Sequence, residues 1–66
     1  GLFAFLRDLF SEKRKEGVRK LSFNDLFIET KASFPNITEK NLKVYLYDKR
    51  QLKSAKFNSK LGEVTF

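Results

Sequence analysis

The chain has 66 residues, and its 14 Lys and Arg stand against eight Asp and Glu, which gives a formal net charge of +6. This length fits one small domain, which buries only about 60% of the surface of its unfolded chain. Because Cys and His are absent, disulfides, thiolate nucleophiles, zinc fingers and histidine-based acid–base catalysis are excluded. Aliphatic residues and eight Phe must therefore close the core.

The start of the chain bears on its origin and location. Since it begins at Gly1 rather than at Met, we expect residues 1–66 to be a single domain cut from a larger protein. The longest apolar run, residues 2–6, is far shorter than the ~20 residues that a membrane span needs, so no membrane partner is expected. The lack of Cys is compatible with a reducing interior, so we expect an intracellular protein of the cytoplasm, nucleoid or nucleus.

Apolar residues at helical spacing predict a first helix from Leu2 to about Glu16. The basic run 13–15 suits the negative end of the helix dipole, and Gly17 suits the position just after the helix. The apolar stripe consists of Leu2, Phe5, Leu6, Leu9 and Phe10, with Phe3 at its edge.

This stripe is about 160° wide, broader than a helix on one small core requires. One interpretation is that a Phe-rich core compensates for the short chain. A second is that Phe3 and Phe10 contact another surface, either a second copy or the rest of the parent protein. A third, an interfacial membrane helix followed by the basic run, would leave the rest of the chain without a core partner.

The middle of the chain carries clear boundary signals. Residues 18–21 permit a brief strand, and Ser22 with Asp25 three residues later forms a capping signature. A second helix is predicted from Phe23 to Phe34, where Pro35 stops it because the residue before a proline is pushed out of helical geometry.

A third helix is predicted from Glu39 to about Arg50, with Thr38 as its N-cap. Leu42, Tyr45, Leu46 and Lys49 share one face and would meet the core, while Lys40, Lys43, Val44, Tyr47 and Gln51 lie opposite. Alternating apolar residues around the turn-rich stretch 58–62 then predict a β-hairpin over residues 52–66. The expected fold class is α+β, with three helices, a short strand and a C-terminal hairpin.

Catalysis has little support in this sequence. The carboxylates are scattered among Lys and Arg, and three isolated Gly cannot form a phosphate-binding loop. We therefore expect no enzyme, no cofactor and no metal site.

The positive charge is unevenly distributed. Residues 40–60 hold seven Lys and Arg against one acid, and the rest of the chain is balanced at seven against seven. Such a segment attracts phosphate backbones through counterion release. The alternative is a basic surface without a partner.

The outer face of the third helix suits the major groove. Lys can donate to guanine, Gln can bond adenine, and Val44 could touch a thymine methyl, while Tyr47 could bond a phosphate or stack. The alternative is that Val44 and Tyr47 pack beneath the hairpin.

The order and spacing of these elements, and the stretch from Asn36 to Leu46, resemble the winged helix-turn-helix family over nearly the whole chain. The resemblance implies that the third helix enters the major groove of DNA and that the hairpin, or wing, touches the backbone or minor groove. The groove-facing residues would be Thr38, Lys40, Asn41, Lys43, Val44, Tyr47, Arg50 and Gln51, and those of the wing Lys53, Lys56, Ser59 and Lys60.

We therefore expect a non-enzymatic module that binds double-stranded DNA, within a regulator or a replication or recombination protein. The alternative is a winged-helix protein-interaction or dimerisation module that uses the Phe-rich first helix. RNA binding ranks lower, because the sequence lacks the strand aromatics typical of RNA-stacking sheets.

Overall fold

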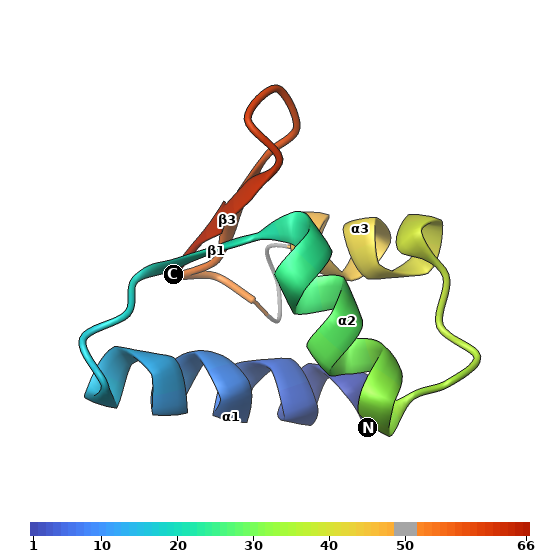
Figure 1. The fold of residues 1–66 in the computed structure, drawn as a ribbon, viewed down its shortest axis with the longest axis horizontal. Coiled ribbons are helices and arrows are strands. Elements are labelled where there is room, and N and C mark those ends of the chain that lie inside the picture. Colours follow the sequence, from blue (N-terminus) through green and yellow to red (C-terminus); the bar gives the residue numbers. More distant parts are fainter. Residues whose placement is uncertain (49–51) are drawn as a thin grey trace.

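In the computed structural model, which describes residues 1–48 and 52–66, three helices pack together beside a small sheet whose hairpin projects away from them (Figure 1). The elements are α1 (Leu2–Lys15), β1 (Lys20–Ser22), α2 (Phe23–Ser33), α3 (Glu39–Tyr47), β2 (Lys56–Asn58) and β3 (Glu63–Thr65). The α+β class is confirmed: over these residues the structure has three helices and a three-stranded antiparallel sheet.

The helix boundaries follow the local signals closely. After α1, Gly17 has a φ of +84°, a left-handed geometry that glycine adopts without strain. Its N–H donates to the Arg14 carbonyl at 3.0 Å, and the Val18 N–H donates to the Lys13 carbonyl at 2.9 Å. These two bonds form a Schellman motif, which satisfies carbonyls left open at the helix end.

Hydroxyl caps begin both of the other helices, as predicted. The Ser22 Oγ accepts a hydrogen bond from the Asp25 backbone N–H at 3.0 Å, and the Thr38 Oγ1 accepts one from the Asn41 N–H at 3.1 Å. Each cap satisfies a donor that the first turn of a helix cannot pair internally.

The end of α3 differs from the prediction. We expected the helix to continue to about Arg50, but it ends at Tyr47, and Asp48 has left helical geometry with a ψ of 95°. Aspartate is a poor helix former, because its short side chain competes for nearby backbone groups, which favours this earlier end. Lys49, expected on the core face, lies outside the described residues.

The sheet has the strand order β1-β3-β2. Val64 pairs with Leu21 on one side and with Phe57 on the other, and this row faces the core. Thr65 pairs with Lys20 and with Lys56, and this row is exposed. The predicted hairpin is confirmed, while the short strand forms at 20–22, slightly later than the 18–21 expected.

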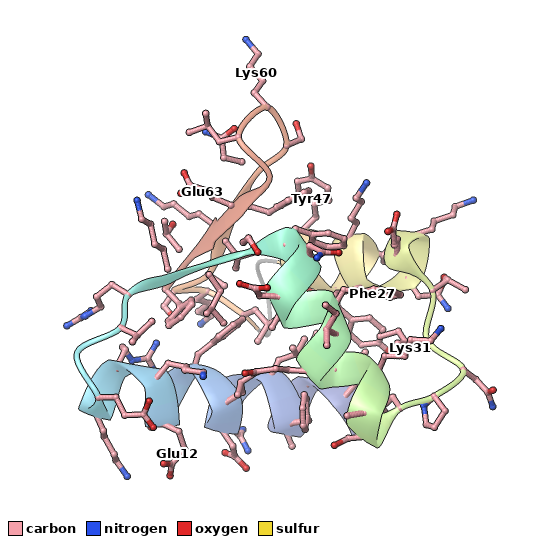
Figure 2. The ribbon with its side chains drawn as sticks, in the orientation of Figure 1. Glu12, Phe27, Lys31, Tyr47, Lys60 and Glu63 are labelled. Carbon is pink, nitrogen blue, oxygen red and sulfur yellow. The ribbon has the colours of Figure 1, made fainter. Side chains whose placement is uncertain are left out.

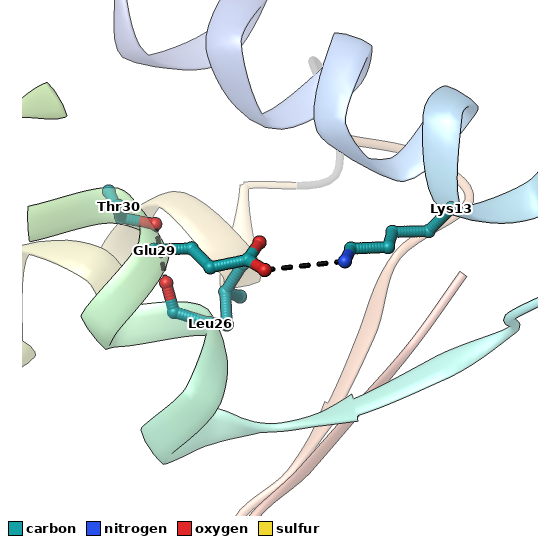
Figure 3. Close-up of polar contacts among 4 residues, drawn as sticks. All are labelled: Lys13, Leu26, Glu29 and Thr30. Atoms are coloured by element: carbon teal, nitrogen blue, oxygen red, sulfur yellow. Dashed lines mark hydrogen bonds and ion pairs between the residues drawn. The ribbon is translucent and has the colours of Figure 1, made fainter. Parts of the chain in front are cut away.

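The core gathers side chains from every helix and from β3. Its fully buried members are Leu6, Phe10, Leu26, Thr30, Leu42, Leu46 and Val64. Thr30 is accommodated because its hydroxyl donates to the Leu26 carbonyl at 2.7 Å within α2 (Figure 3). The same view shows an ion pair between Lys13 of α1 and Glu29 of α2, 3.3 Å apart, which joins the two helices at the surface.

Phe10 corrects one expectation about the first helix. Its side chain is 2% exposed and its ring stacks on that of Phe66, with centroids 4.5 Å apart, so it is unavailable to another protein. Phe3 is half-buried and packs against Tyr45 of α3 at 4.4 Å. The wide apolar stripe of α1 therefore serves mainly the core of its own chain.

We expect Phe10→Ala to lower the free energy of unfolding by about 3–5 kcal/mol, because it removes a ring from a filled core. Urea denaturation followed by circular dichroism measures this. Phe3→Ala is the matched control and should cost clearly less, since that ring is partly exposed. Equal losses for the two variants would contradict the assignment of Phe10 to the centre of the core.

Candidate nucleic-acid interface

The outer face of α3 is open to solvent. Leu42 and Leu46 are turned into the core, which places Val44 and Tyr47 outside, where they are 61% and 55% exposed. Lys40, one turn before Val44, is exposed as well. An aliphatic side chain, a phenol and an ammonium group therefore lie together on this face, with the N-cap at Thr38 fixing where the helix starts.

Of Val44 and Tyr47, the two residues that could instead have packed beneath the hairpin, only Tyr47 contacts it, and only with one edge of its ring. The edge of the Tyr47 ring contacts Phe57 of β2, with centroids 5.7 Å apart and planes at 60°. The rest of Tyr47 stays exposed beside the base of the hairpin (Figure 2). Val44 instead borders a shallow hollow of about 240 Å³ shared with Phe3 and Tyr45.

Asn41 and Lys43 lie on opposite flanks of α3, because residues two positions apart in a helix are separated by about 200° around its axis. Asn41 lines a hollow of about 430 Å³ that also includes Leu2 of α1. Lys43 is half-buried, and its ammonium lies 5.3 Å from the centre of the Phe23 ring in α2. The predicted groove-facing set therefore spans more of the helix than one face can present.

A row of aromatic rings runs from α3 across β2 to α2. Phe57 lies between Tyr47 and Phe23, and Phe23 is 6.3 Å from Phe27 in the same helix. Lys43 lies over the Phe23 ring. The ammonium of Lys31, on α2, lies 5.4 Å from the centre of the Phe27 ring. Sequence reasoning missed this row; the i, i+4 spacing of the two α2 rings was the available signal.

The side chain of Asn58 stabilises the turn of the hairpin. The Asn58 Oδ1 accepts hydrogen bonds from the backbone N–H groups of Lys60 and Leu61, at 3.0 and 3.1 Å. Gly62 adopts a φ of +63°, and its carbonyl accepts from the Phe23 N–H of α2 at 2.7 Å. The turn is therefore ordered internally and attached to the start of α2.

The basic hairpin residues project from this frame. Lys60 extends from the end of the hairpin, on the opposite side of the molecule from Glu12 of α1 (Figure 2). Ser59 beside it is exposed, and so are Lys56 on β2 and Lys53 in the segment before that strand. Arg50 and Gln51, the remaining predicted contacts, lie outside the described residues.

Some cations of the domain are paired with a carboxylate and others are not. Arg7 and Lys13 have carboxylates within 4.0 Å, and Lys20 on β1 pairs with Glu63 at 3.4 Å. Within the part of the chain that the structure describes, no such carboxylate partner occurs for the described lysines of the 40–60 segment, which are Lys40, Lys43, Lys53, Lys56 and Lys60, nor for Arg14, Lys15, Arg19 and Lys31. The 40–60 segment is set apart by its charge balance, because Asp48 is its one acid.

A metal cluster and a membrane-spanning helix would each need a feature that residues 1–48 and 52–66 do not contain. No group of three acidic side chains gathers there to hold a metal ion. None of the helices in the same ranges has the length and apolar character that crossing a membrane takes.

Comparisons of the chain with protein-family models, with curated proteins and with solved structures each found no match. Geometry and charge therefore carry the functional assignment.

We expect Asn58→Ala to loosen the hairpin turn, because the backbone donors of Lys60 and Leu61 lose their shared acceptor. The expected cost is about 1 kcal/mol in the free energy of unfolding. Hydrogen exchange by NMR should show faster exchange of those two amides. Asn58→Asp, which keeps an acceptor oxygen, is the control; unchanged exchange in the alanine variant would contradict this account of the turn.

Proposed function

We propose that this domain is a non-enzymatic winged helix-turn-helix module that binds double-stranded DNA, with α3 in the major groove and the β2–β3 hairpin, as its wing, on the backbone. The observation that carries the proposal is the set of lysines without carboxylate partners on α3 and the hairpin, next to the exposed Val44 and Tyr47.

The element order supports the winged-helix part of the proposal. A short turn over 34–38 joins α2 to α3, and an antiparallel hairpin follows α3 in the chain. The third strand of the sheet comes from between α1 and α2. α1 supplies core residues beneath the other elements, so that the hairpin and the outer face of α3 remain uncovered (Figure 1).

The electrostatic part follows from where the ammonium groups lie. A lysine already paired to a carboxylate gains less from a phosphate, because that contact must first be broken or shared. Lys53, Lys56 and Lys60 are exposed and without such partners among the described residues, so each can neutralise a phosphate and release a counterion.

Sequence reading would come from the centre of the exposed face. The major groove is about 12 Å wide and admits an α-helix. There, Lys40 can donate to the O6 and N7 acceptors of guanine, and the Val44 methyls can contact a thymine methyl. The Tyr47 hydroxyl, near the base of the hairpin, can bond a phosphate.

We expect duplex affinity to fall steeply with salt. With three phosphate contacts, from Lys53, Lys56 and Lys60, log K against log[salt] should have a slope of about −2.7, so that affinity drops about fortyfold between ~50 and ~200 mM salt. Fluorescence anisotropy with a labelled duplex measures this.

Lys60→Ala should make that slope shallower by about one unit for every duplex sequence. The control is Lys15→Ala at the end of α1, which should leave the slope unchanged. Affinity independent of salt would refute the proposed DNA-binding function.

We expect Val44→Asp to reduce duplex affinity by at least tenfold, because it places a carboxylate at the centre of the face opposite the phosphates. The side chain is mostly exposed, so the melting temperature should stay nearly constant. The matched control is Ile28→Asp on α2, which is exposed to nearly the same extent (59%) but lies outside the interface. Parallel losses in both variants would show that α3 has no special role.

A further inference from the structure

The end of the hairpin carries an apolar side chain that the fold does not use. Leu61 is 68% exposed, more than Ile28, Val44 or Tyr47. It belongs neither to the core nor to the hydrophobic residues packed against it. Turns favour Gly, Asn, Asp, Ser and Pro, so a leucine here needs a reason other than turn geometry.

Leu61 is held in place rather than left to rotate with a loose loop. Its own N–H donates to the Asn58 side chain, and the next residue, Gly62, is tied through its carbonyl to the N–H of Phe23 in α2. β3, which follows directly, is the central strand of the sheet. The backbone that carries the leucine is therefore ordered before binding, so little conformational entropy is lost when its side chain inserts into a partner.

The surroundings of Leu61 favour a polyanionic partner. Lys60 precedes it at the turn, Lys56 lies on the same hairpin, and neither has a carboxylate partner among the described residues. Leu61 and both lysines border one shallow hollow along the hairpin. An apolar tip flanked by cations is the combination with which proteins enter the DNA minor groove: the cations hold the phosphates, and the apolar side chain wedges between base pairs.

We propose that Leu61 is a wedge that enters the minor groove, partly unstacks one base step and bends the duplex. This inference rests on the proposed DNA binding, because α3 in the major groove would bring the projecting hairpin to the neighbouring minor groove. It adds the local unstacking of a base step, which phosphate contacts along the backbone do not supply, because unstacking requires a side chain between the bases.

The bend is measured by energy transfer between dyes at the two ends of a duplex of ~25 base pairs that contains a central flexible TA step. The full domain should bend this duplex by an angle within the ~20–90° range of wedge-inserting proteins. A 2-aminopurine placed at the step should brighten as it unstacks.

Leu61→Ala should abolish the bend and the 2-aminopurine signal, with a loss of affinity of about tenfold or less, because Lys60 and α3 remain. Leu61→Phe, which keeps a wedge, should retain both signals. Ile28→Ala, an equally simple truncation of an exposed aliphatic side chain on α2, should change neither.

The outcomes separate the two proposals. Absence of salt-dependent duplex binding would overturn the proposed function itself. Tight duplex binding without a bend, or a bend that survives Leu61→Ala, would overturn the wedge and leave DNA binding intact. A variant whose only defect is loss of binding to vesicles of anionic lipid, or loss of self-association in sedimentation, would also overturn the wedge and assign Leu61 to that surface.

Discussion

The pairing of β1 with β3 is the constraint on which the rest of this small domain depends. Ser22 is both the last residue of β1 and the N-cap of α2, so the strand sets where that helix begins. The following N–H, from Phe23, bonds the Gly62 carbonyl at the start of β3. One short ladder therefore fixes the hairpin relative to α2, and through the tight turn after α2 it fixes the hairpin relative to α3.

This arrangement lets a chain without cysteines separate its core from its exposed chemistry. Phe10 and Phe66 stack at the centre, and the half-buried rings of Phe27 and Phe57 close the core toward the surface under lysine side chains or beside Tyr47. Aromatic rings bury much area per residue, which suits a domain with so few residues.

Local signals predicted the helices well, because each cap is encoded by one or two residues. Ser22, Thr38 and Gly17 mark helix ends through bonds within a few positions of the chain. The site was harder to predict. Placing Asn41 and Lys43 on one face ignored the geometry of the helix, and the attraction of Lys43 to Phe23 depends on tertiary packing that periodicity does not contain. Phe10 was misplaced because an apolar stripe does not show which of its members face inward.

The ion pair between Lys20 and Glu63 gives the sheet a polarity from one edge to the other. Lys20, on the β1 edge, is neutralised by the carboxylate of the central strand, whereas Lys56, in the same cross-strand row on the β2 edge, is not. The unpaired ammonium of this row therefore lies on the β2 edge, which contacts α3. In the proposed DNA complex, that ammonium would attract the polyanion to the β2 edge before any contact forms, so the sheet would set the orientation of the encounter.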